Sequence, residues 1–397
     1  MWRRGAPMGG YFLTNSFRFF FPVAWGMGDW GGLMWVFFSL GGIAYPAQAH
    51  PQSMVVGFLL GHIMGFLLTA GPRFTATGDL KTSEFSLAAS CFAAVCFSVM
   101  LQAPVQTGFG LAALSIAVLA GILGRRFLAR TKSPPVEFIF LPFGLVAGLV
   151  GASGQAFSSY LESDVLRRLA SLFLYEGFVL SLVLGVGGRL APFLMGHGLE
   201  PTVSQDKAAV KSGVSRLVIP LVLFWMTYLF EAASIADVIQ TSTWRLLRGL
   251  VVAYALLRDW KIGRMPKAGT RQGWGIWLSA WMMVSGSLIS VYAGWKIHSI
   301  HLFYIGGLGL LTLMVATRVT LAHGSKRLLL ESTSRVLYPV VAMILAASIT
   351  RFSAGFLPQS YISHLAYAGG LWGIALAIWG WVFLREGFYQ RLGSADG

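Results

Sequence analysis

The stretch HLFYIGGLGLLTLMVATRVTLAH, from His301 to His323, is apolar over the width of a bilayer and carries a histidine at each end. A helix needs about 20 such residues to cross the hydrocarbon core. Arg318 and Thr320 lie inside the stretch, and an arginine at that depth must face the protein interior or an anion. The stretch therefore predicts a transmembrane helix that also belongs to a functional site.

The composition extends this interpretation to the whole chain. Of its 397 residues, 56% are hydrophobic and 11% are charged, whereas a soluble domain has about 25% charged residues. Apolar runs of roughly 17–25 residues recur with short polar breaks, and the breaks are too short to hold a soluble domain. We therefore predict an all-α, polytopic membrane helix bundle that forms a single integral membrane domain over residues 1–397.

About twelve transmembrane helices are expected, each with uncertain boundaries. The predicted spans are 20–44, 53–71, 85–101, 108–124, 136–157, 168–188, 214–231, 243–257, 272–293, 298–320, 334–350 and 364–384. The first six spans and the last six show no convincing self-similarity, which disfavours the two-half repeat of many transporters.

Lysines and arginines are concentrated in breaks on one side of the predicted bundle. The clusters are Arg3 and Arg4; Arg125, Arg126, Arg130 and Lys132; Arg258, Lys261, Arg264, Lys267 and Arg271; and Lys326, Arg327 and Arg335. The positive-inside rule then places both termini in the cytoplasm of a multi-pass protein of the cell inner membrane. The net charge of +15 is explained by this face and anionic lipid, so we expect the lipid bilayer and no nucleic acid as a partner.

The seven histidines fall into two layers of this topology. The layer in the outer half contains His50, His62, His298, His301 and His364. The layer at the cytoplasmic side contains His197 and His323, together with Arg73, Arg189 and Arg318. A single histidine at the headgroups is usually an ordinary interfacial residue, but His62 lies within a span and needs a partner or a ligand.

The outer layer has features of a haem site. His298 and His301 lie one turn apart on one face, and a glycine-rich run follows at 306–309. An imidazole beside glycine-lined space suits a haem, whose iron takes axial histidine and whose propionates pair with arginine. The same histidines also fit a transporter that binds a small solute or a metal.

Two acidic residues lie at membrane depth. Glu176 is inside the predicted span 168–188, and Glu231 closes the span 214–231. Either carboxylate could relay protons to the outer layer, which makes Glu176 the candidate catalytic residue, or could pair with an arginine or a lysine. Both interpretations stay open on the residues alone.

Four segments of the chain resemble, in order, the NnrS family of polytopic haem- and copper-containing membrane proteins associated with nitric oxide metabolism. SFRFFFPVAW at 16–25 is similar to the FRPFF segment of the family, and the segment at 50–75 is similar to its H-x-H-E-M-x-x-G-F and G-F-L-L-T-A run. GGRLAPFLMGHGL at 187–199 resembles G-G-R-x-x-P-x-F-T-x-N, and 301–323 matches the pattern that ends in T-R-x-x-L-G-H.

This resemblance implies a haem b protein that binds, reduces or detoxifies nitric oxide, in denitrification or nitrosative stress, with an unidentified electron donor. Whether it is an enzyme stays open. The implied primary ligands are His50 and His301, and the next candidates are His62 and His298. The implied inner metal site or propionate clamp consists of His323 with Arg318, Arg189 and Arg73, and His197 is a further candidate cofactor ligand.

The chain departs from the family pattern at the possible copper site. Gln52 and Ser53 stand where the pattern has a histidine and a glutamate, so a copper site that uses this pair loses an imidazole and a carboxylate. His62 and His197 stand where an apolar residue and an asparagine are expected. Two alternatives remain: a small-solute or metal transporter, and a haem sensor or electron-transfer subunit without turnover.

Overall fold

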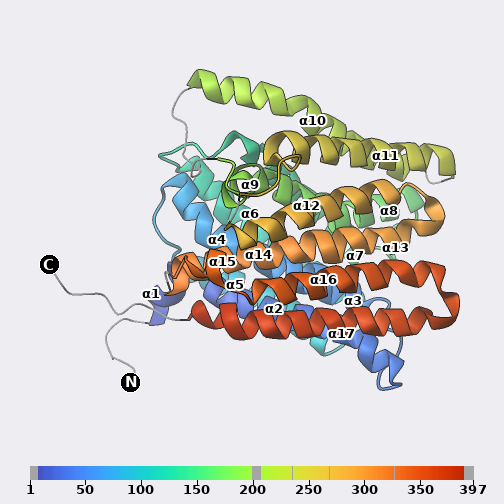
Figure 1. The fold of residues 1–397 in the computed structure, drawn as a ribbon. Coiled ribbons are helices and arrows are strands. Elements are labelled where there is room, and N and C mark those ends of the chain that lie inside the picture. The colour runs from blue at the N-terminus through green and yellow to red at the C-terminus, as the bar shows by residue number, and fades with distance from the viewer. Residues whose placement is uncertain (1–7, 199–206, 235, 268, 326, 389–397) are drawn as a thin grey trace.

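The structure is a computed structural model, and it describes residues 8–198, 207–234, 236–267, 269–325 and 327–388. Within these ranges the regular elements are all helices, and no strand occurs. Figure 1 shows long helices that run side by side along one common direction. The predicted all-helical class is therefore confirmed.

The long helices are α2, α5, α6, α7, α10, α11, α12, α16 and α17, together with three that are interrupted by π-helical turns. Their bounds are α2 Phe17–Ser39; α3 Ala49–Pro51, η1 Gln52–Leu59 and α4 Leu60–Thr75; α5 Thr82–Met100; α6 Val105–Leu128; η2 Val136–Ile139 and α7 Phe140–Ala156; α8 Asp164–Leu172, η3 Phe173–Phe178 and α9 Val179–Leu194; α10 Lys207–Ala233; α11 Val238–Ala255 and η4 Leu256–Trp260; α12 Arg271–Ile289; α13 Lys296–His301, η6 Leu302–Gly309, α14 Leu310–Thr320 and η7 Leu321–Ser325; α16 Leu337–Ser353; α17 Tyr361–Trp379 and η10 Gly380–Leu384. The short helices α1 and α15 span Met8–Leu13 and Leu330–Thr333. Each predicted span falls on one of the long helices.

Nine helices of the described ranges are long and apolar enough to cross a membrane. Three further long helices, α2, α11 and α12, coincide with predicted spans but are not apolar enough to count as candidate membrane spans. Tryptophan and glycine lower the hydropathy of α2 and α12, and α11 carries Arg245 and Arg248. The structure thus supports a multi-pass membrane protein, with nine candidate spans against the twelve predicted.

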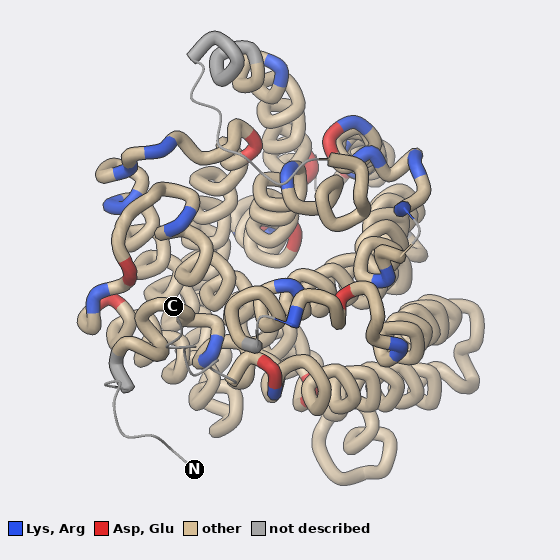
Figure 2. Tube along the Cα trace, turned by 60° about the vertical axis from the view of Figure 1, so that its left-hand side comes forward, with Lys and Arg blue, Asp and Glu red and all other residues tan. Residues whose placement is uncertain are grey.

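The two ends of the described chain lie at the same end of the bundle. The hydroxyl of Tyr11 in α1 donates a hydrogen bond of 3.0 Å to the carbonyl oxygen of Phe388. Figure 2 shows lysines and arginines distributed around this end. The arrangement agrees with an even number of crossings, and the cytoplasmic location of this end remains a prediction.

Three segments form the centre of the bundle, and we call them the inner helices: Ala49–Thr75, Asp164–Leu194 and Lys296–Gly324. In an apolar stretch of 18 residues within each inner helix, 61 to 72% of the residues are buried, against 50% or less in the corresponding stretches of the other candidate spans. Each inner helix contains a π-helical segment, η1, η3 or η6. Such segments are rare and occur often at functional sites.

The packing of the bundle repeats every four long helices. One flanking helix, α2, α7 or α12, packs against each inner helix. The two helices that follow each inner helix also pack together, in the pairs α5 with α6, α10 with α11, and α16 with α17. Contacts of α6 with α7, α11 with α12, and α17 with α2 join the three groups into a ring. The internal repeat is therefore threefold, which a comparison of two halves does not detect.

The glycines of the inner helices serve close packing. A Cβ atom on Gly61 would lie 2.4 Å from the ring of Phe92, and one on Gly307 would lie 2.5 Å from Cγ of Met283. The corresponding position on Gly309 is 2.7 Å from the indole of Trp372. The expectation that these glycines leave a slot for a macrocycle is therefore wrong, because side chains of neighbouring helices fill the space.

Candidate functional site

His50 and His301 stand at the same place on two inner helices, just before the π-helical segments η1 and η6. Nδ1 of His50 lies 2.8 Å from the carbonyl oxygen of Gly31, and Nδ1 of His301 lies 2.6 Å from that of Ile297. Since a carbonyl only accepts, Nδ1 carries the hydrogen in both rings. Nε2 of each ring therefore has a lone pair, and within the described ranges no hydrogen-bond donor is within reach of it.

The two imidazoles share one environment. They lie close enough to interact electrostatically with each other, and each also interacts with Arg351. Each ring is partly buried and keeps some accessible surface. The indole of Trp35 packs edge-on against His50, with ring centroids 5.4 Å apart. The structure thus brings together the two residues that the resemblance implies as primary ligands.

Arg351, near the end of α16, was not among the predicted site residues. Its side chain is 7% exposed, and its Nη1 donates to Nδ1 of His298 at 3.1 Å. Among the described residues no carboxylate forms an ion pair with it. A buried guanidinium of this kind favours an anionic partner. The only sequence signal was its position one residue beyond the predicted span 334–350.

His62 lies deeper on the same inner helix as His50. Its Nδ1 is 2.8 Å from the carbonyl oxygen of Phe58. The rings of Phe21 and Phe58 pack against it, with centroids 4.9 and 4.6 Å away. Its Nε2 is buried and has no hydrogen-bond partner among the described residues. His62 is therefore separate from the pair formed by His50 and His301.

Part of the predicted cytoplasmic layer gathers around His323. Arg73, Arg318 and Arg18 are its electrostatic neighbours. Nη1 of Arg318 donates to both carboxylate oxygens of Glu331 at 2.9 Å. Nη2 of Arg73 donates to Oδ1 of Asn15 at 3.1 Å. These arginines therefore already have partners within the protein.

The other two members of that layer lie elsewhere. Arg189 lines a cavity of about 400 Å³ together with Glu137, Arg216 and Arg258. His197 lies in the turn after α9, where its carbonyl oxygen accepts a bond of 3.5 Å from Lys261. The predicted layer thus forms two separate groups.

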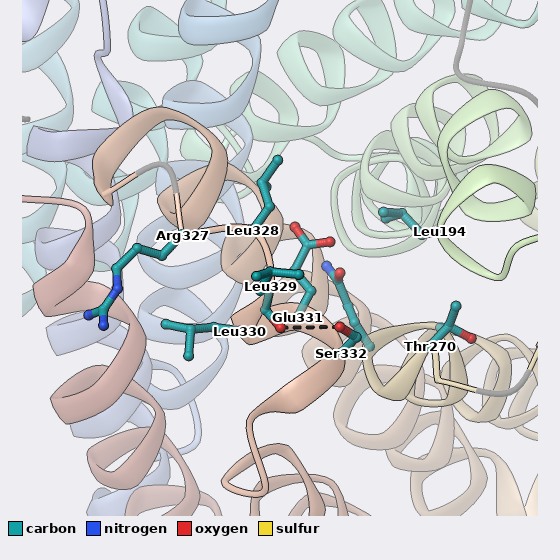
Figure 3. Close-up of a pocket in the computed structure, with 10 residues that line it drawn as sticks. Leu194, Thr270, Arg327, Leu328, Leu329, Leu330, Glu331 and Ser332 are labelled. Carbon is teal, nitrogen blue, oxygen red and sulfur yellow. Dashed lines mark hydrogen bonds between the residues drawn. The ribbon is translucent and has the colours of Figure 1, made fainter.

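A larger cavity of about 540 Å³ lies at the same end, between α9, α12 and α15. In Figure 3, Leu194 of α9 lies across this cavity from the segment 328–332, which includes Glu331. Burial raises the pKa of the Glu331 carboxyl above its ordinary value of 4.5, and Arg318 opposes the shift only in part.

This raised pKa predicts a pH-dependent stability. Between the ordinary pKa and the raised one, the folded state binds more protons at Glu331 than the unfolded state does, so stability falls as the pH rises through that window. We expect Glu331→Gln to remove this loss. Thermal unfolding of both proteins from about pH 4 to pH 8 measures it. A decline of equal steepness in the variant would contradict the prediction.

Glu231 and Glu176 belong to a buried charge network at the end of the bundle opposite the termini. Glu231 is fully buried and pairs with Arg245 at 2.8 Å and with Arg248 at 2.6 Å. Arg168 lies 3.4 Å from the same carboxylate, and Nη2 of Arg248 lies 3.1 Å from Glu176. Of the two roles left open for Glu176, the structure shows the ion pair, and proton relay stays a prediction.

The residues present do not fit the copper site of the family pattern. Nε2 of Gln52 donates to the carbonyl oxygen of Val105, and Oγ of Ser53 donates to that of Met27, both at 2.7 Å. Both side chains therefore help to pack the inner helix. Within the described ranges, no three histidine, cysteine, aspartate or glutamate side chains come together to hold a metal ion.

Comparison with known proteins identifies the family of the chain. The family model described as NnrS protein matches residues 11–386, which is nearly the whole chain. No curated protein matches it. The NnrS family implies a membrane protein linked to the nitric oxide response, and it is associated with haem and copper. The predicted resemblance is therefore confirmed, and the chain belongs to the NnrS family.

Proposed function

We propose that the protein binds haem b between His50 and His301, with Arg351 beside a propionate, and handles nitric oxide in the membrane. The observation that carries this proposal is the pair of imidazoles from two inner helices, each with Nδ1 bound to a carbonyl and Nε2 unpaired. The two rings lie close enough to interact electrostatically, and both interact with Arg351.

The donor set fits a haem in three respects. Imidazole is a common axial ligand of haem iron, and Nδ1 bound to a carbonyl fixes the ring and makes Nε2 a better donor. Arg351 supplies a buried positive charge for a carboxylate. When bound, the haem supplies a redox-active iron that takes nitric oxide at an open coordination position.

The presence of two imidazoles also favours a second candidate function. If both His50 and His301 held the iron of a haem, no coordination position would stay open, as in many electron-transfer haems. The protein would then be a haem sensor or an electron-transfer subunit without turnover. Nitric oxide would bind only if one of the two imidazoles were displaced.

Visible spectra of the purified protein distinguish these functions. We expect a Soret band in the oxidised and dithionite-reduced protein, and a shift of that band when nitric oxide is added to the reduced form. A Soret band that ignores nitric oxide would support the electron-transfer function. A preparation that stays colourless after haem reconstitution would contradict haem binding, and the transporter function would then be favoured.

A further inference from the structure

A small cavity of about 100 Å³, which we call the axial cavity, lies where the three inner helices meet. All three helices contribute to its wall, through residues that include Leu59 and Ile63, Val183 and Val186, and Leu311 and Val315. The wall is almost entirely apolar. Its polar side chains are those of Thr312, whose hydroxyl donates to the carbonyl oxygen of Leu308 in its own helix, of His62, and of Trp260 through the indole Nε1.

The axial cavity adjoins the 540 Å³ cavity at the end of the bundle that carries the termini. Leu194 lines both cavities, and its side chain is 6% exposed. Figure 3 shows Leu194 at the edge of the larger cavity. At its other end the axial cavity reaches Leu59, the last residue of η1. Leu59 follows His50 by nine residues in the sequence, a rise of roughly 13 Å.

Size and chemistry restrict the occupant of the axial cavity. An apolar cavity of about 150 Å³ in another protein stays dry and binds xenon or benzene, and a buried water needs two to four polar partners. Nε2 of His62 and Nε1 of Trp260 are the wall atoms without a hydrogen-bond partner among the described residues, so a water would find only the minimum of two free polar partners, and the rest of the wall favours an apolar occupant. The wall has no charged side chain that could pair with an ion, and a volume of about 100 Å³ favours a very small occupant.

We propose that the axial cavity is a binding site for a neutral diatomic gas and a path for it from the larger cavity, past Leu194, toward His50 and His301. The identification of that gas as nitric oxide rests on the proposed function. The site itself rests only on the shape and the apolar lining of the cavity.

Xenon tests the site without any need for haem. We expect xenon to occupy the axial cavity of the wild-type protein, detected in a xenon-pressurised structure or by xenon NMR. Val315→Phe fills the cavity from an inner helix and should abolish that occupancy. Leu223→Phe adds the same ring to a half-exposed position on α10 and should leave it intact. Absence of xenon from the wild-type cavity would overturn the proposed site.

Nitric oxide association tests the path. Leu194→Trp should slow the association of nitric oxide with the reduced protein by about tenfold, equivalent to an added barrier of about 1.4 kcal/mol, with an unchanged Soret band. Val315→Phe should also slow the association of nitric oxide. This second variant keeps the path testable if Leu194→Trp does not fold. Unchanged rates in both variants, with xenon bound in the wild type, would overturn the path. If no haem binds, the proposed function fails and the xenon result still decides the site.

Discussion

Replacing His301 with alanine is expected to abolish the Soret band of the protein or to reduce haem occupancy by at least roughly tenfold, since changes even to the partners of metal ligands cost 10–100-fold. The imidazole is positioned by its bond to the carbonyl of Ile297, and it lies close enough to His50 to interact with it electrostatically. Absorbance per mole of purified protein, after reconstitution with haem, measures the effect.

His364→Ala is the matched control for this prediction. His364 lies at the same end of the bundle, but its Nδ1 is bound to Oγ1 of Thr350 at 2.8 Å. Its loss should leave the spectrum unchanged. Free imidazole added to His301→Ala should restore part of the Soret band, because it can replace the missing ligand. A full native spectrum in His301→Ala without imidazole would disprove the assignment.

Replacing Glu231 with alanine is expected to cause the largest loss of stability, about 3–5 kcal/mol. Glu231 is fully buried and compensates Arg245 and Arg248, which are themselves buried. Without the carboxylate these guanidinium groups stay in a low-dielectric interior with only Glu176 nearby. Thermal unfolding of the protein in detergent measures the loss.

Two further variants serve as controls, one at Glu231 and one at a surface ion pair. Glu231→Gln keeps the volume and some hydrogen bonds, so its loss should be smaller but still large. Asp164→Ala removes a carboxylate that pairs with Arg167 at the surface, where its side chain is 68% exposed. Exposed pairs contribute little, so this variant should unfold near the wild-type temperature. Equal unfolding temperatures for Glu231→Ala and Asp164→Ala would refute a structural role of the network.

The sequence predicts the helices well because the length of an apolar run is a local property. Each predicted span coincides with a long helix, including the span that contains the stretch 301–323. The sequence does not tell which helices are inner ones, since this depends on contacts between groups of helices that lie far apart in the chain. The threefold packing repeat is visible only once those contacts are known.

The candidate site was predictable only in part. His50 and His301 were found from their layer and from the family resemblance, and the structure places them together. Arg351 was missed because its significance depends on the absence of a nearby carboxylate, which no local pattern shows. The space beside the glycines near His301 could not be predicted either, because Met283 and Trp372 fill it from helices that are distant in the sequence.

The closure of the ring has a consequence for the biogenesis of the protein. Trp372 of α17 donates to the carbonyl oxygen of Gly28 in α2 at 2.9 Å, so the last long helix completes the wall begun by the first. His50 leaves the ribosome early, whereas His301 and Arg351 follow some 250 and 300 residues later. The proposed haem site is therefore complete only when membrane insertion is nearly finished, so we expect cofactor loading to be a late step of assembly.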